Sequence, residues 1–311
     1  MILPETFELV RPSIVAFISR AALIQPSGPP KLPQILGTGF FVNESGLVVT
    51  NRHVVEVFGT LPRDPRSGSV AVGALVFLPS RPEGDGISMG ILDVDLDDWW
   101  QMNTFRAEAN WHGEILPDIG FVQIRATGTP ALKFYEEPGT LRVGASIATA
   151  GFAMGELPIL IHGHVTQITP LLRRGIISSV FPFNGPFPHG LTIDAMVQPG
   201  ASGSPVFLED QPIVIGMIGS VLRDQAYATL ALPDGSIANI AIPLSTNVSI
   251  ALPGHLLAKA AEVVQEKVVG DRAKGFPLLS SLVPNDEADH SSIDWVESLL
   301  SKIGQTCAGP H

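Results

Sequence analysis

The chain has 311 residues, of which 45% are hydrophobic and only 16% are charged, and its formal net charge is −11. This length accommodates one large domain or two modest ones, and the hydrophobic content is sufficient for a sizeable core. The acidic balance and the lack of clustered Lys and Arg argue against a nucleic-acid partner, so we expect none.

The N-terminal segment carries Glu5 and Glu8 before its first apolar run. A signal peptide has a positive start and a continuous apolar centre, so none is predicted. No apolar run reaches the roughly 18 residues of a membrane span, and we expect no span either. Cys307 is the only cysteine, which excludes an internal disulfide and is typical of a reducing compartment. These features predict a cytoplasmic protein.

Short apolar runs separated by Gly and Pro continue to about residue 250 and predict many short strands. They cover residues 13–19, 37–42, 46–51, 69–78, 118–124, 146–152, 158–165, 191–197, 212–221 and 239–244. Because helices do not alternate with these runs, an antiparallel barrel or sandwich is favoured over a parallel sheet. The string VNESGLVV predicts a hairpin with its turn near Gly46, and residues 125–140 predict a linker between two β halves.

Residues 81–113 are less regular and place several aspartates beside Trp99 and Trp100. These aspartates are Asp93, Asp95, Asp97 and Asp98. Their alternation suggests a calcium loop, but the Gly at the sixth position and the Glu at the twelfth that an EF-hand requires are both missing. We therefore expect a solvated acidic insertion here and no metal site.

The pattern changes after residue 252, where two helices are predicted. Residues 255–269 have apolar side chains at helical spacing. Residues 291–304 start with a capping box of Ser291 and Asp294 and end at Gly304. Two roles remain open for this tail: it covers the barrel surface, or it mediates contact with a second copy or another partner.

The string VQPGASGSPVF, residues 197–207, predicts a rigid turn with Ser202 at its apex. Glycine at position 200 permits a backbone geometry in which the amides of Gly200 and Ser202 converge on one point, as in an oxyanion hole. Taken alone, the string also fits an ordinary Gly/Ser hairpin turn. The α/β-hydrolase pattern G-x-S-x-G fails, because Ser204 occupies its fifth position.

A nucleophilic serine needs a base, and the base needs a carboxylate that fixes its tautomer. Among the eight histidines, His53 is the best placed, because it follows a predicted strand that ends at Thr50 and Asn51. Asp118 leads directly into an apolar run, where a carboxylate is costly to bury without a partner. Asp93 and Asp95 are the alternatives for the third position.

The strings GTGFFVNESGLVVTNRHVV, DIGFVQI and QPGASGSPVF follow one another in the order His, Asp, Ser. In this order they resemble the chymotrypsin-fold (trypsin-like) serine proteases, with the bacterial HtrA-type and glutamyl endopeptidase branches closest. The resemblance covers about residues 10–250. It implies an all-β fold of two six-stranded antiparallel barrels, over residues 1–128 and 129–252, with a helical extension over 253–311. That extension is too short for the PDZ domain of HtrA-type enzymes.

The resemblance also implies roles for individual residues. His53 is the general base, Asp118 its orienting partner and Ser202 the nucleophile, while the amides of Gly200 and Ser202 form the oxyanion hole. No metal or organic cofactor is required. Ala201 stands where the family usually has Asn or Asp, and Gly120 where it usually has Ala.

By the same analogy, the substrate pocket has its floor at Met196 and two wall strands. The wall residues are Met217, Ile218, Gly219 and Ser220 on one side and Asn239 and Ala241 on the other. The floor has no acidic residue, and Ile218 stands where glutamyl endopeptidases have a histidine. We therefore expect cleavage after small or medium aliphatic residues.

The implied function is a serine endopeptidase that acts on polypeptides through an acyl-enzyme intermediate. An inactive scaffold of the same fold, which binds peptides or a partner protein, is the alternative; the intact trio of residues disfavours it. The loop FPFNGPFPHG, residues 181–190, precedes the strand that leads to the nucleophile. Its aromatic residues Phe181, Phe183 and Phe187 either pack on the barrel or dock a partner, and we hypothesise that the loop gates the oxyanion hole.

Overall fold

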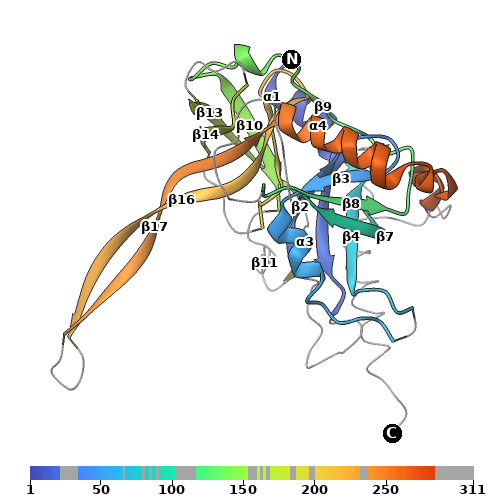
Figure 1. Ribbon diagram of the computed structural model, residues 1–311, viewed down its shortest axis with the longest axis horizontal. Coiled ribbons are helices and arrows are strands. Elements are labelled where there is room, and N and C mark those ends of the chain that lie inside the picture. Colours follow the sequence, from blue (N-terminus) through green and yellow to red (C-terminus); the bar gives the residue numbers. More distant parts are fainter. Residues whose placement is uncertain are drawn as a thin grey trace, which may run out of the picture.

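A computed structural model gives the fold of the chain. It describes residues 1–21, 34–65, 67–78, 81–83, 86–88, 91–102, 117–152, 160–161, 164–165, 169–182, 187–195, 200–231 and 237–283. Two β-barrels lie side by side, with a helix crossing over them and a long two-stranded ribbon projecting to one side (Figure 1). None of the helices in the described part of the chain is long and apolar enough to cross a membrane.

The first barrel is closed by six antiparallel strands in the order β1-β2-β3-β8-β7-β4, because β4 pairs with β1. Its strands are β1 (Ile14–Ser19), β2 (Ile35–Phe41), β3 (Leu47–Thr50), β4 (Val72–Phe77), β7 (Ile91–Gln101) and β8 (Gly120–Ile124). The hairpin expected at VNESGLVV is confirmed, since β2 and β3 pair and Gly46 takes a φ of +82° between them. Helix α3 (Arg52–Phe58) follows β3 directly.

The second barrel also closes with six antiparallel strands, in the order β15-β10-β13-β14-β17-β16, because β16 pairs with β15. Its strands are β10 (Ser146–Gly151), β13 (Leu171–Phe181), β14 (Gly190–Asp194), β15 (Pro205–Leu208), β16 (Ile213–Ala231) and β17 (Ile237–Pro253). The short strand β9 (Lys133–Phe134) adds a parallel pairing to β16. The predicted architecture of two six-stranded barrels is therefore confirmed, while the domain boundaries at 128 and 252 stay predictions.

The remaining elements are short or terminal. They are α1 (Leu3–Val10), η1 (Arg11–Ser13), β5 (Arg81–Glu83), β6 (Gly86–Ser88), η2 (Pro138–Thr140), β11 (Leu160–Ile161), β12 (His164–Val165), α4 (Gly254–Val264), η3 (Gln265–Val269), η4 (Arg272–Gly275) and η5 (Leu279–Leu282).

A shared apolar core holds the two barrels together. Phe77 of β4 stacks on Phe152, which follows β10, with ring centroids 5.2 Å apart. Phe40 of the first barrel and Phe207 of the second are fully buried in the same cluster. Burial of such aromatic side chains is the largest favourable contribution that a barrel interface of this kind can make.

The prediction of an irregular acidic insertion is wrong for residues 91–101, because they form the regular strand β7. The alternation that suggested a calcium loop is the two-residue period of a strand. Val94 is buried in the barrel core and Leu92 packs against it, whereas Asp93 and Asp95 point to the other side and both contact Arg20. Residues 103–113 lie outside the described residues.

The predicted helix at 255–269 is confirmed: α4 runs from Gly254 to Val264 and continues as a π-helix to Val269. Leu257 and Val264 are buried in the core that joins the barrels. Farther along, the backbone of Thr127 exchanges hydrogen bonds of 2.8 and 2.7 Å with Pro277 and Leu279. Residues 254–282 therefore cover the barrel surface, and the helix predicted at 291–304 lies outside the described residues.

We expect Leu257→Ala to lower the free energy of unfolding by about 2–5 kcal/mol, because it leaves a cavity where the tail meets both barrels. Val263→Ala on the exposed side of the same helix is the matched control and should change it by less than about 0.5 kcal/mol. Urea unfolding of both variants measures the difference. Equal stabilities would mean that the helix is not part of the common core.

Candidate active site

His53 and Asp118 are in direct contact at one end of the first barrel. The ring nitrogen Nδ1 of His53 lies 3.0 Å from both carboxylate oxygens of Asp118. The backbone N–H of His53 donates a second hydrogen bond of 3.1 Å to Asp118 Oδ1. With side chains 48% and 35% exposed respectively, both groups are held in place yet remain open to a ligand.

The pairing of β3 with β8 produces this contact. Thr50 at the end of β3 is the register partner of Gly120 at the start of β8, so the residues just beyond these two ends meet. The buried Asn51 side chain donates a 3.1 Å hydrogen bond to the backbone carbonyl of Asp118. A Cβ at Gly120 would lie 2.8 Å from Val55, so glycine lets α3 approach the sheet closely.

The hydrogen bond that His53 donates to the Asp118 carboxylate raises the pKa of His53 above its usual 6.5. Partial burial of the ring opposes this effect, while the negative charges of Asp118 and Glu56 reinforce it. A protonated His53 is therefore stabilised by its surroundings, which is the property expected of a group that accepts a proton during a reaction.

The turn that carries Ser202 has the backbone geometry expected of it. Gly200 and Gly203 have φ values of +92° and +86°, a region that residues with side chains rarely adopt. The turn is closed by a 3.0 Å hydrogen bond from the Ser204 N–H to the Ala201 carbonyl, and the Gly203 N–H donates to the Ile218 carbonyl at 3.1 Å.

The buried residue Thr38 of the first barrel holds this turn with both its backbone and its side chain. Its N–H donates to the Ser202 carbonyl at 2.9 Å, and its hydroxyl donates to the Gly200 carbonyl at 2.9 Å. The same hydroxyl accepts a 3.0 Å hydrogen bond from the N–H of Phe152. Thr38 thus holds the Gly200–Ala201 peptide through its hydroxyl and the Ser202–Gly203 peptide through its N–H.

Thr50 connects this clamp to the segment that carries His53. Its hydroxyl donates a 2.6 Å hydrogen bond to the Thr38 carbonyl. A Cβ at Gly203 would collide with that carbonyl and lie 2.6 Å from the Thr50 hydroxyl oxygen, so only glycine fits there. The end of β3 at Thr50, three chain positions before His53, is therefore packed against the Ser202 turn.

The contacts of Thr38 and Thr50 were not predicted from the sequence. A threonine in an apolar run such as GTGFFV fits an ordinary strand position, and only the pairing of two distant segments gives its hydroxyl a partner. Among the described residues, the side-chain hydrogen bonds of His53 go to Asp118. A transfer of a proton from Ser202 to His53 is therefore part of the proposal below.

The residues expected to form the substrate pocket are spread over two places. Met217 and Ile218 are buried next to the Ser202 turn, and Gly219 and Ser220 follow them toward the surface. Met217 faces Leu252 across the β16–β17 ladder, and Ile218 faces Ala251. Met196, the predicted floor, lies outside the described residues.

Asn239 and Ala241 lie elsewhere, because their register partners are Thr229 and Tyr227 in the projecting ribbon. Ten residues separate Tyr227 from Met217 along β16, which is roughly 33 Å in an extended strand. These two residues do not flank Met217–Ser220, and the strand that does so is the segment Ile250–Leu252.

In the loop 181–190, residues 183–186 lie outside the described residues and so does Phe183. The ring of Phe187 lies 6.1 Å from the ring of His255 at the start of α4. Burial lowers the pKa of His255 to about 4, with a further contribution from the charge of His189. Phe187 therefore packs on the helix, and a role of the loop in gating stays a hypothesis.

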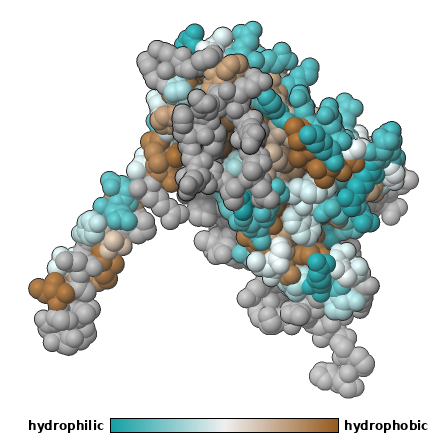
Figure 2. Space-filling model, in the orientation of Figure 1, coloured by the Kyte–Doolittle hydropathy of each residue, from teal (hydrophilic) through white to brown (hydrophobic). Residues whose placement is uncertain are grey.

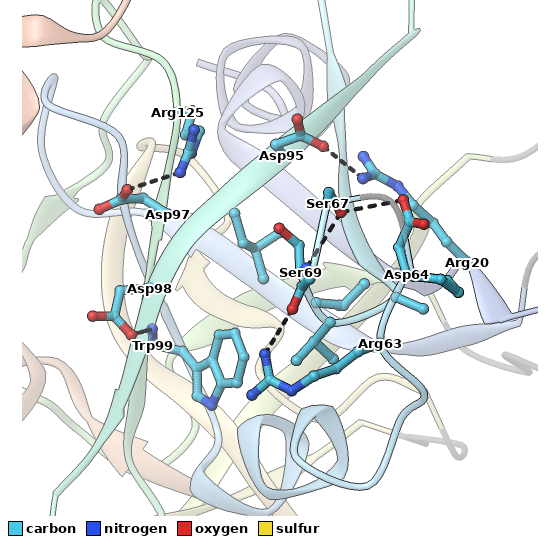
Figure 3. A pocket seen from close by; sticks show the side chains of 16 residues that line it. Arg20, Arg63, Asp64, Ser67, Ser69, Asp95, Asp97, Asp98, Trp99 and Arg125 are labelled. Atoms are coloured by element: carbon cyan, nitrogen blue, oxygen red, sulfur yellow. Dashed lines mark hydrogen bonds and ion pairs between the residues drawn. The ribbon is translucent and has the colours of Figure 1, made fainter. Parts of the chain in front are cut away.

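A second cluster of charged residues lines a cavity of about 1270 Å³ beside β4 and β7 of the first barrel (Figure 3). Its lining contains none of the three candidate residues. Asp95 faces Arg20, and Asp97 faces Arg125 at 3.6 Å (Figure 3). Asp97 also contacts Arg272 of the tail at 2.7 Å. These aspartates are therefore engaged in ion pairs that join β1, β7, β8 and the tail.

Comparison with known proteins gives a consistent family. The trypsin-like peptidase domain matches residues 37–217, more than half of the chain. A probable periplasmic serine endoprotease, DegP-like, from Halomonas elongata is 24% identical over 277 residues, covering 87% of this chain but 48% of the relative. The chain thus spans about half the length of that protein.

Among solved structures, the HtrA-type protease AlgW with a decapeptide has the same fold. Its TM-score is 0.50 at 15% identity, with 86% of this chain and 68% of that chain covered. The expectation of a cytoplasmic protein is contradicted, because the curated relative is a periplasmic protein. The two closed barrels, the ordered His, Asp and Ser segments and the match over residues 37–217 lead to one assignment: the chain belongs to the trypsin-like peptidase family.

Proposed function

We propose that the protein is a serine endopeptidase in which Ser202, His53 and Asp118 form the catalytic triad. The observation that carries this proposal is the 3.0 Å contact of His53 Nδ1 with Asp118, beside a glycine-framed turn that presents Ser202. An inactive scaffold would have no physical need for this combination of a base, its orienting carboxylate and a preformed anion site.

The proposed reaction depends on which ring nitrogen of His53 is bonded to Asp118. Because Nδ1 donates its hydrogen to the carboxylate, Nε2 has the lone pair that accepts the proton of the Ser202 hydroxyl. Ser202 Oγ then attacks the peptide carbonyl carbon, and His53 returns the proton to the leaving amine. A water molecule then takes the place of the amine: His53 accepts its proton, and its oxygen attacks the acyl carbon. The ester bond to Ser202 breaks, His53 returns the proton to Ser202 Oγ, and the acid product leaves.

The oxyanion that forms in each step needs hydrogen-bond donors already in place. The N–H groups of Gly200 and Ser202 are the proposed donors, and the positive φ of Gly200 supports their convergence. Loss of one such donor typically costs about 2.7–4 kcal/mol of transition-state stabilisation. Thr38 holds the carbonyls of the adjoining Gly200–Ala201 and Ser202–Gly203 peptides and so restrains the backbone that carries both donors, without being one of the donors itself.

Polypeptides are the proposed substrates, cut after small or medium aliphatic residues. Met217, Ile218 and Gly219 next to the Ser202 turn carry no charge, which supports an apolar acyl-side residue and gives Lys, Arg or Glu no counter-charge. The DegP-like relative is named an endoprotease and AlgW is solved with a decapeptide, which supports peptide substrates. The location of that relative supports a periplasmic site of action.

We expect wild-type protein to react with a fluorophosphonate probe and to cleave proteins in a denatured mixture, and Ser202→Ala to do neither. Ser204→Ala, two residues away on the same turn, is the matched control and should retain labelling. Mass spectrometry of the cleavage products gives the preferred residues. If folded wild-type protein is not labelled, the scaffold interpretation is correct; a strong preference for Lys, Arg or Glu would contradict the apolar pocket.

We expect Asp118→Asn to lower the pKa of His53, because the amide removes both the hydrogen-bonded carboxylate and its charge. NMR titration of the His53 ring measures the shift. Because the pKa of His53 is higher in the folded state than its usual 6.5, protonated His53 stabilises the folded protein at pH values below 6.5. This contribution disappears as the pH rises through the pKa of His53 in the folded state. Turnover should fall by about 10⁴-fold, because the amide no longer holds the imidazole in the tautomer whose Nε2 accepts the serine proton.

We expect Thr38→Val to reduce turnover by about tenfold, the equivalent of one lost hydrogen bond, with KM changed by less than about twofold. Thr38→Ser keeps the hydroxyl on the Gly200 carbonyl and should restore most of the rate. Thermal melting separates this effect from simple destabilisation. A valine variant with normal turnover would show that the hydroxyl does not position the oxyanion donors.

A further inference from the structure

Strands β16 and β17 continue far beyond the second barrel as a two-stranded ribbon, which we call the arm (residues 222–231 and 237–246). The register runs from Arg223 opposite Ser245 to Ala231 opposite Ile237. A bulge between Val221 and Arg223 marks its base, beside Asn247 with a φ of +61°. Figure 1 shows the arm projecting away from both barrels, and none of the other described strands pairs with its outer edges.

The pleat of the ribbon sorts its residues into two faces. Directly opposite residues share a face, so Leu230, Ala226, Ile240 and Leu244 lie on one face with Asp224. Leu230, Ile240 and Leu244 are 46%, 44% and 47% exposed. Hydrophobic atoms are visible along the arm, well away from the body (Figure 2). We call this the apolar face of the arm; the opposite face also exposes Tyr227 and Ile237, among polar residues such as Gln225 and Thr229.

The arm has few of the charged residues that usually keep exposed strands apart, although Pro243 lies in one of its strands. From residue 225 to residue 253 the only charged residue is Asp234, although the chain as a whole has a net charge of −11. Lysines and other charges on the edges of strands are the usual protection against pairing with another chain. A two-stranded hairpin is also marginally stable in water unless a third strand or another surface covers it. The arm therefore needs a covering partner.

We propose that the arm packs on a second copy of this chain, with each copy receiving the apolar face of the other's arm. One face of ten residues by two strands measures roughly 33 by 10 Å, or about 330 Å². A single arm on one partner surface buries about 660 Å² in total, which is below the range of stable interfaces. Reciprocal exchange of two arms doubles this to about 1,300 Å², within the usual range of about 1,200–2,000 Å².

The charge of the arm separates this partner from the other candidates. An anionic membrane binds surfaces that are rich in Lys and Arg. The arm has only one such residue, Arg223, so a membrane is disfavoured as its partner. A peptide bound to one edge would gain only the smaller, one-sided area. A copy of this acidic chain can approach an arm that carries almost no charge without bringing like charges together. The proposal does not depend on the proposed protease activity.

The test is the mass of the full chain by sedimentation velocity at about 20 µM, well above the Kd expected for a stable interface. We expect the wild type to sediment as a dimer or a larger closed assembly. The double variant Leu230→Lys/Ile240→Lys places two charges on the apolar face and should sediment as a 33.0 kDa monomer. The control Gln225→Lys/Thr229→Lys adds the same charge to the opposite face and should keep the wild-type mass.

Thermal melting shows whether the barrels of each variant are intact, because the arm lies outside their cores. A monomeric wild type would overturn the proposal, and so would an assembly that survives the apolar-face variant or dissociates equally in the control. Binding of a monomeric wild type to anionic vesicles or to an unfolded polypeptide, lost in the apolar-face variant, would assign the arm to that partner instead.

Discussion

The candidate site depends on one residue that belongs to neither the triad nor the second barrel. Thr38 in β2 contacts the carbonyls of Gly200 and Ser202, and its own carbonyl accepts from Thr50 at the end of β3. The Ser202 turn and the strand end that precedes His53 are thereby both hydrogen-bonded to the same residue of β2. Because a buried carbonyl without a partner is costly, any rotation of one barrel against the other would lose several hydrogen bonds together. The shared aromatic core of Phe77 and Phe152 opposes the same rotation by packing.

Much of this arrangement was predictable from local patterns. The apolar runs located most barrel strands, and the glycines at 200 and 203 predicted the positive φ values that the turn adopts. His53 and Asp118 were predicted from their positions beside strand ends, and the pairing of Thr50 with Gly120 explains why those ends meet. Thr38 escaped detection because its role depends on a contact across 162 chain positions, and no local pattern reports such a contact.

The two-residue period of a strand explains why the sequence of residues 91–101 suggested a calcium loop and an irregular insertion. In β7, aspartates on one side and Leu92, Val94 and Leu96 on the other produce the alternation that resembled a metal loop. The aspartates are retained because Arg20 and Arg272 neutralise them from neighbouring parts of the fold. A single sequence reveals the alternation but not the arginines that face it, so the choice between insertion and strand required the tertiary structure.

The arm shows how strand length changes the meaning of a position. Analogy with the family placed Asn239 and Ala241 in a pocket wall, which holds only if the ribbon turns back soon after Ser220. Here β16 continues to Ala231, and each added residue pair moves the returning strand away from the barrel by roughly 3.3 Å. The residues beside Met217 are consequently those at 250–252, close to the start of α4. Because α4 begins at Gly254, directly after these residues, the root of the tail helix lies against β16, where a Cβ at Gly254 would be 2.8 Å from the Val214 carbonyl.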